Sequence, residues 1–294
     1  MSDRPKVLVA GATGYLGKHV VRALTEAGYP VRALARNPER LGDVRDLCTD
    51  VVVAEATKPE TLTDLVGDAT VMFSSLGKHD FKRKPTVWDI DHQANLNLVE
   101  RAAAGGVKHF VFISVVHAEE LAARGMDQAI AREKVVEAAR ATSMTTTVLR
   151  PSGFFNDMAD FFEMARKGTG WVLGDGSSRM NPIHGADLAA EVVRVIGDPT
   201  THGQSLSVGG PDVLTYNQIM ELAFAALGKK PRLRRVPLWT VRPVPYLVRP
   251  FNPMVGGLIG AVLAMADLGA VARPVGTHHL ADFFVELAAT SRTR

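Results

Sequence analysis

"KVLVAGATGYLGKHVVRAL", residues 6–24, passes from a short apolar run through three glycines into a helical pattern. Val7–Val9 predict a buried strand, because they form a continuous and mostly β-branched run. From Leu16 onward the apolar residues recur at helical spacing, and Gly28 marks the expected helix end. A glycine turn before a helix N-terminus presents backbone N–H groups to an anion, which predicts a diphosphate site. The alternative is a plain strand–turn–helix connection.

Strand-like and helix-like segments alternate through about the first 150 residues. We expect strands at 7–9, 31–35, 51–54, 69–77, 108–116 and 145–155. Strands that alternate with helices pair in parallel through right-handed crossovers. The sequence therefore predicts an α/β fold with a Rossmann-type doubly wound parallel sheet. Such a sheet binds ligands beyond the carboxyl ends of its strands.

The pattern changes after Pro151, where aromatic helices and glycine turns replace the regular alternation. We expect a dinucleotide-binding domain over residues 1–153. Residues 154–294 are expected to form a smaller, mostly helical substrate-binding lobe, with segments that return to the sheet.

The composition excludes several classes of protein. The 294 residues are 46% hydrophobic and carry a net charge of +3, so no strongly charged partner is indicated. Cys48 is the one cysteine, which fits a reducing, cytoplasmic setting, and the N-terminus lacks a signal-peptide pattern. The nine histidines lack a metal-ligand spacing, so we expect no metal site.

Several motifs together resemble one family, the atypical short-chain dehydrogenases/reductases of the NmrA-like kind. These motifs are "GATGYLG", "VRALARNPERL", "SSLGK", "GGVKHFVFISVV", "REKVVE", "LRPSGFFNDM", "GDGSSRMNPIHGADLA" and "VGGPDVLTYNQIMELAF". The resemblance covers about residues 5–230 in order. It implies a Rossmann fold and a nicotinamide dinucleotide cofactor, whereas activity in the family ranges from reductases through isomerases to redox sensors.

The resemblance also implies which residues hold the cofactor. They lie in the glycine turn, after the third and fourth strands, on the helix after the fifth strand and after the sixth strand. These residues are Gly11, Thr13, Gly14, Tyr15, Leu16, Gly17, Glu55, Ala56, Ser74, Ser75, Leu76, Lys134, Pro151, Gly153 and Phe154.

The end of the second strand favours NADP(H) over NAD(H). An acidic residue there would bind the ribose 2′-hydroxyl and repel a 2′-phosphate. The strand instead ends in Ala35 and Arg36, and Arg32 lies on the same face of the strand. A guanidinium suits a phosphate through paired N–H donors. The alternative is a solvated surface arginine.

The catalytic pattern of the family is incomplete. Active short-chain dehydrogenases carry Tyr-x-x-x-Lys on the helix after the fifth strand, where the tyrosine exchanges a proton with the substrate. Lys134 matches the lysine, but Ile130 stands four residues before it and cannot donate a proton. Ser114, His117 and Lys134 are the catalytic candidates; a solvated loop histidine and an exposed lysine are the alternatives for the last two.

Two functions follow from this pattern. The first is an NADP(H)-dependent oxidoreductase that acts on a bulky, apolar, conjugated small molecule. The second is an NADP(H)-binding redox sensor or regulatory protein without turnover, since Ile130 replaces the tyrosine. The sequence leaves the oligomeric state open.

The C-terminal half contains a segment without acidic residues, Leu222–Ala266, whose basic residues alternate with aromatic ones. This pattern suggests weak contact of residues 229–266 with a membrane surface or with a lipophilic substrate. The alternative is an apolar pocket wall beside solvated arginines. We expect no nucleic-acid binding, because no groove-reading motif accompanies the charges.

Overall fold

A strand forms at each of the six apolar runs expected in the first 150 residues, and two later strands extend the same sheet. The computed structural model describes residues 4–78 and 83–292. The sheet has the order β12-β9-β6-β5-β4-β1-β2-β3. Its strands are β1 (Val7–Ala10), β2 (Val31–Ala35), β3 (Asp50–Val53), β4 (Val71–Ser74), β5 (His109–Ile113), β6 (Thr145–Pro151), β9 (Ser205–Gly209) and β12 (Arg273–Pro274).

Helices connect these strands, and four further short strands form two small sheets. The helices are α1 (Tyr15–Glu26), α2 (Asn95–Ala104), α3 (Ala118–Ala123), α4 (Asp127–Arg140), α5 (Phe155–Arg166), α6 (Gly185–Gly197), α7 (Tyr216–Ala226), α8 (Leu238–Val241), α9 (Val244–Val248), α10 (Pro253–Leu268) and α11 (Leu280–Arg292), with the 3-10 segments η1 (Pro38–Leu47), η2 (Pro59–Thr61) and η4 (Pro199–Thr201). Strand β7 (Gly170–Leu173) pairs with β11 (Leu233–Val236), and β8 (Arg179–Met180) pairs with β10 (Leu214–Thr215).

The chain forms two units, each made of several segments. The first contains residues up to Ser114, Asp127–Arg150 and Leu188–Leu206. The second contains Val115–Met126, Pro151–Asp187 and the residues from Ser207 onward. The division near residue 153 that the sequence suggests stays a prediction.

The strands of the first unit are parallel and level with one another. Ala10 at the end of β1 pairs with Leu34 of β2 and with Ser74 of β4, and Ser74 pairs with Phe112 of β5. This register places the first residues after β1, β2, β4 and β5 at one edge of the sheet. The prediction of a Rossmann-type parallel sheet is confirmed.

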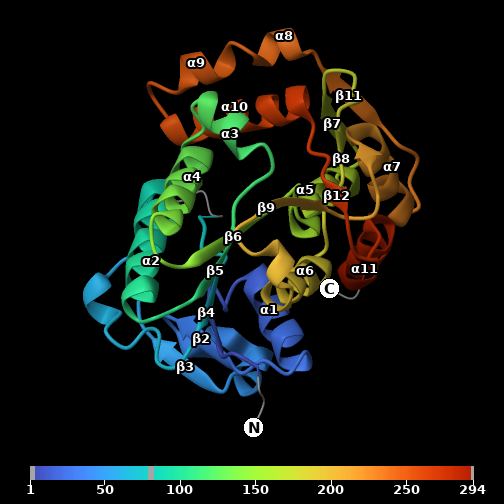
Figure 1. Ribbon diagram of the computed structural model, residues 1–294. Helices are drawn as coiled ribbons and strands as arrows, with labels where there is room; N and C mark the ends of the chain where they lie inside the picture. The colour runs from blue at the N-terminus through green and yellow to red at the C-terminus, as the bar shows by residue number, and fades with distance from the viewer. Residues whose placement is uncertain (1–3, 79–82, 293–294) are drawn as a thin grey trace. The chain divides into compact units, whose positions relative to one another are not determined.

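Apolar side chains cover both faces of this sheet. In Figure 1, α2 and α4 lie on one side of the strands, and α1 and α6 lie on the other. The side under α2 and α4 is a buried cluster in which Met72, Phe110 and Phe112 meet Leu98 and Val135. Burial of such side chains supplies the main driving force for this arrangement.

The second unit has its own apolar core. Helices α5, α7 and α11 contribute Phe155, Phe162, Phe224 and Phe284, all buried in one cluster. Phe162 and Phe284 stack with ring centroids 6.1 Å apart.

The element before α2 departs from regular α-helical geometry. Residues Trp88–Ala94 form a π-helical segment, η3, that leads directly into α2. The wider turn brings Asp91 and Asn95 inward, and both are fully buried and hydrogen-bonded. Such π-helical segments occur often at functional sites.

Candidate functional site

The turn between β1 and α1 needs glycine at two positions for different reasons. Gly11 has φ of +88°, and a Cβ there would lie 2.7 Å from Ser75 Oγ. A Cβ on Gly17 would lie 2.0 Å from the Gly11 carbonyl oxygen, so this glycine lets α1 pack against the turn. A Cβ on Gly14 would meet only Gly11 O, at 3.2 Å. Gly14 therefore keeps the approach to the α1 N-terminus open.

The start of α1 suits an anion. The helix begins without a side-chain cap, and no acidic residue lies in its first turn. Thr13 and Tyr15 are half-buried beside this turn, whereas Leu16 is buried in the core. The open approach at Gly14 and the uncapped helix end fit a diphosphate group, as the sequence predicts.

A cationic pair follows β2 and β3. The Arg36 side chain is 62% exposed, and its Nη1 lies 3.7 Å from Glu55 Oε1. Lys58 Nζ lies 3.1 Å from the other oxygen of Glu55, and this hydrogen bond lowers the pKa of the carboxyl. Two cations thus share one carboxylate, which leaves a net positive charge for a phosphate. Ala56 is buried, and its carbonyl accepts a hydrogen bond from Asn97.

Arg32 belongs to the fold and not to this pair. Its guanidinium is buried and bonds Asp50, while Nη2 lies 2.9 Å from Asp64 Oδ2. Nε donates to the carbonyl of Leu65 at 3.0 Å. Arg32 is therefore buried in ion pairs within the fold, whereas Arg36, directly after β2, is exposed.

The loop after β4 is held by a buried polar network. Ser74 Oγ donates to Asn95 Oδ1 at 2.7 Å, and Asn95 Nδ2 donates to the Leu76 carbonyl at 3.3 Å. Ser74 is fully buried, so its hydroxyl shapes the loop from within. Ser75 and Leu76 are half-buried, and the Ser75 N–H donates to the Ala10 carbonyl. This places the loop beside the glycine turn.

A buried ion pair fixes the other end of this loop. Arg132 of α4 bonds Asp91, with Nε and Nη2 lying 2.9 and 2.8 Å from Oδ1. Asp91 Oδ2 accepts the backbone N–H of Lys78 at 2.8 Å. A Cβ on Gly77 would lie 2.0 Å from Arg132 Nη2, so a larger residue there would displace the buried guanidinium. Sequence reasoning missed this pair, because its partners are 41 residues apart.

Three side chains meet at the carboxyl ends of β5 and β6. Ser114 Oγ donates to Glu133 Oε1 at 2.9 Å. Arg150 binds both oxygens of Glu133, with Nη1 at 2.9 Å from Oε1 and Nη2 at 2.7 Å from Oε2. Ser114 and the Arg150 side chain are nearly buried, whereas the Glu133 side chain keeps 21% exposure. Each carboxylate oxygen has two acceptor positions, so Oε2 can accept one more hydrogen bond.

The structure brings Glu133, and not Lys134, to Ser114. Lys134 lies about 200° around α4 from the buried Arg132, at 100° per residue, and is exposed. It lines a surface hollow of about 360 Å³ together with His92, Leu96, Glu137, Ala138 and Ala141. None of the five other residues that line this hollow is a predicted cofactor ligand. The inward face of α4 thus passes through Arg132 and Glu133, and the role of Lys134 in cofactor binding and catalysis stays a prediction.

No residue with a hydroxyl group lies one helical turn before Lys134 or Glu133. Ile130 precedes Lys134 by four positions and is half-buried. Ala129 precedes Glu133 by four positions and is fully buried. The helix therefore offers no tyrosine for proton transfer in either register.

The remaining candidates belong to the second unit. His117 precedes α3 in a left-handed conformation with φ of 55°, and its Nδ1 lies 3.9 Å from Glu120 Oε1. The Pro151 carbonyl accepts the Val116 N–H at 3.2 Å. Gly153 has φ of +144°, and Phe154 pairs with Ile183 in an isolated bridge. Roles for these four residues in cofactor binding or catalysis stay predictions.

Two kinds of feature are absent from residues 4–78 and 83–292. No group of three or more histidine, cysteine or acidic side chains is arranged to hold a metal ion. Within residues 4–78 and 83–292, no helix is both long enough and apolar enough to cross a membrane.

The profile of the NmrA-like family matches residues 3–262. Among curated proteins, divinyl chlorophyllide a 8-vinyl-reductase of Oryza sativa subsp. indica is 32% identical over 249 residues, which are 79% of this chain and 61% of the relative. The photosystem II assembly factor Ycf39 of Guillardia theta is 27% identical over 79% of this chain and 73% of its own. The chain thus spans about three fifths of the rice relative's length.

A solved structure has the same fold. The NADPH-dependent quinone oxidoreductase QOR2 of Escherichia coli, crystallised with NADPH, superposes with a TM-score of 0.75. The match covers 96% of this chain and 99% of the other, at 18% sequence identity.

Proposed function

The chain belongs to the NmrA-like family, and on this premise we propose that it is an oxidoreductase that uses NADP(H). Its substrate is a bulky, apolar, conjugated small molecule. One observation carries the proposal: an open glycine turn at Gly14 and an exposed cation at Arg36 lie at the same edge of a parallel sheet. This combination suits a diphosphate beside a 2′-phosphate.

The cofactor extends along the edge of the sheet from β2 to β5. Arg36 and Lys58 bind the 2′-phosphate, and the turn around Gly14 holds the diphosphate. The loop at Ser75 and Leu76 then faces the nicotinamide riboside. Strands β2 and β5 are separated by β1 and β4, which is about 14 Å at ordinary strand spacing. An extended dinucleotide can span this distance.

Glu133 is the residue that we assign to the nicotinamide ribose. Its Oε2 has an acceptor position left after the bonds from Arg150. A ribose hydroxyl can donate to it, and the carboxylate strengthens that hydrogen bond. Ser114 and Arg150 hold Glu133 in one orientation, so the site is ordered before the cofactor arrives.

The substrate class follows from the missing tyrosine and from the relatives. A bound nicotinamide cofactor supplies a hydride, and the substrate must receive a proton as well. Reduction of a conjugated C=C bond can take that proton from water, whereas a carbonyl oxygen needs a positioned acid. The names of the relatives, a vinyl-reductase and a quinone oxidoreductase, support conjugated substrates.

A regulatory protein without turnover is the second candidate. The absence of a hydroxyl at both Ile130 and Ala129 favours it, since short-chain dehydrogenases use a tyrosine there. The resemblance to an assembly factor also supports it. In both cases the cofactor site is the same, and a cytoplasmic location stays a prediction.

Turnover with NADPH separates the two candidates. The protein is incubated with NADPH and, in turn, a quinone, an enone and a vinyl-substituted aromatic compound, and the loss of NADPH absorbance is followed. Faster oxidation than without protein, for one substrate, supports the oxidoreductase. Binding of NADPH with no oxidation above background for any of the three would leave the regulatory protein.

A further inference from the structure

Four large apolar side chains stand exposed on one short stretch of the second unit. Trp239 of α8 is 77% exposed, and Tyr246 and Leu247 of α9 are 83% and 67% exposed. Phe251, just after α9, is 87% exposed. Single exposed apolar residues are ordinary. Four large ones within 13 residues expose an unusual amount of apolar surface to water. We call these four residues the α8–α9 surface.

The fold presents these side chains on a supported layer. Figure 1 shows α8 and α9 lying across α10, with β11 leading into α8. Arg249 donates to the Gly125 carbonyl at 2.8 Å, and Arg242 lies 3.2 Å from Asp267. A Cβ on Gly256 would lie 2.9 Å from the Arg249 backbone, so α9 packs closely on α10. The exposed aromatic rings therefore belong to a fixed layer.

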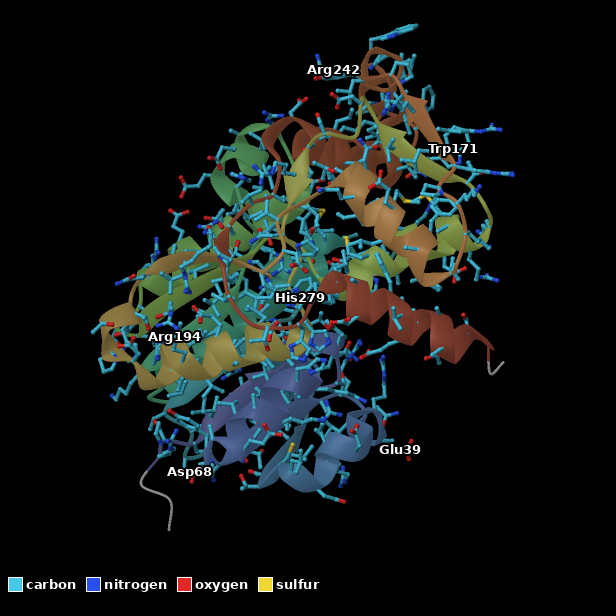
Figure 2. All side chains as sticks on the ribbon, turned by 90° about the vertical axis from the view of Figure 1, so that its right-hand side faces the viewer. Glu39, Asp68, Trp171, Arg194, Arg242 and His279 are labelled. Carbon is cyan, nitrogen blue, oxygen red and sulfur yellow. The ribbon has the colours of Figure 1, made fainter. Side chains whose placement is uncertain are left out.

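Basic residues accompany the α8–α9 surface along the chain, and one of them, Arg242, is paired with Asp267. No acidic residue occurs between Glu221 and Asp267, a segment that contains seven lysines and arginines. All seven are exposed: Lys229, Lys230, Arg232, Arg234, Arg235, Arg242 and Arg249. Arg234 lies over the ring of Trp171, itself 50% exposed on β7, at 5.4 Å. Figure 2 shows Trp171 and Arg242 at the same end of the second unit.

The combination of charge and exposed apolar groups selects the partner. A second copy of this chain would set two basic surfaces against each other, which opposes a symmetric dimer through this face. Nucleic acid would use the cations but would leave Leu247 and Phe251 in water. An anionic bilayer offers phosphate groups to the cations and an interfacial layer to the aromatic rings.

We propose that the α8–α9 surface attaches the protein to an anionic lipid bilayer. Trp239, Tyr246 and Phe251 enter the headgroup layer, where amphipathic rings are stable. The lysines and arginines of the same segment bind the lipid phosphates. The attachment is peripheral and reversible, because the inserted apolar area is small. It stands independently of Gly14, Arg36 and Glu133, the proposed cofactor residues of the first unit.

Vesicle co-sedimentation tests the proposal. The full chain is mixed with vesicles of phosphatidylcholine alone, or of phosphatidylcholine with phosphatidylglycerol. We expect sedimentation only with the anionic vesicles, and its loss as salt rises. Trp239→Ala with Phe251→Ala should lower partitioning about tenfold, and Arg235→Gln about fivefold. Val285→Ala, at a side chain 57% exposed on α11, is the control and should change nothing.

Three results would overturn the proposal. Equal sedimentation with neutral and anionic vesicles would show that the attachment does not depend on the charge of the lipid. If the double variant folds and still binds vesicles like the parent protein, Trp239 and Phe251 have no role in the attachment. A dimer in analytical ultracentrifugation that the same double variant abolishes, without vesicle binding by the parent, would assign the surface to a second copy.

Discussion

Replacing Glu133 by glutamine tests our proposal that this residue binds the nicotinamide ribose. The amide oxygen must turn to Ser114 and Arg150, since both donate to the carboxylate now. The amide NH₂ then takes the place of Oε2, where it cannot accept the hydrogen bond from Arg150 Nη2, and it can still donate to a ribose oxygen. Toward the cofactor, what is lost is the difference between a charged and a neutral hydrogen bond, about 1.4 kcal/mol. The dissociation constant of NADPH should therefore rise about tenfold.

Calorimetric titration with two ligands locates the effect. NADPH contains the nicotinamide ribose, whereas 2′,5′-ADP lacks it and keeps the 2′-phosphate. We expect Glu133→Gln to weaken NADPH and to leave 2′,5′-ADP within about twofold. Lys134→Met and Glu137→Gln, at exposed positions of the same helix, should leave both ligands unchanged.

The reasoning about Glu133 is refuted by one pattern. If Lys134→Met weakens NADPH and Glu133→Gln does not, the lysine anchors the ribose as the family motif implies, and α4 turns differently on binding. If neither NADPH nor 2′,5′-ADP binds the parent protein, the failure lies with the proposed cofactor and not with Glu133.

Four further predictions concern the cofactor site and the fold of the first unit. Arg36→Ala should weaken NADPH about tenfold and leave NADH unchanged in calorimetry, because its exposed guanidinium is the proposed partner of the 2′-phosphate; equal loss for both cofactors would contradict this. Gly14→Val should abolish NADPH binding while circular dichroism and melting stay those of the parent, since its Cβ meets only one carbonyl oxygen; unchanged affinity would move the ligand elsewhere. Asp91→Asn should lower the free energy of unfolding by about 3 kcal/mol, because it leaves Arg132 buried without its charge partner; urea unfolding measures this, and a loss below about 1 kcal/mol would refute it. Burial lowers the pKa of His109 from 6.5 to about 4, so its neutral form is favoured in the fold. Neutral His109 therefore contributes fully to the free energy of unfolding above pH 6.5. This contribution falls by about 3 kcal/mol as the pH drops towards 4. His109→Gln should make urea unfolding less dependent on pH in this range, and an unchanged slope would contradict the assignment.

Local pattern determined the Rossmann sheet and the ligand-binding edge. The mostly β-branched run Val7–Val9 favours a buried strand, and the helical spacing of apolar residues from Leu16 favours a helix after the glycine turn; the structure has both. The absence of an acid after Ala35 is likewise visible without coordinates. These features depend on neighbours within a few residues, so the sequence is sufficient to predict them.

Tertiary structure alone decided which polar side chains meet. Arg32 and Arg36 look equivalent in the sequence, but two aspartates from other elements bind the first and leave the second exposed. Lys134 matched the family motif, but the rotation of α4 on the sheet turns Glu133 inward to Ser114 and Arg150. A helix turns by 100° at each residue, so an error of one position changes the face of the helix. Only packing against the sheet fixes that rotation, which is why the sequence predicted the helix but could not show that Glu133 meets Ser114 and Arg150.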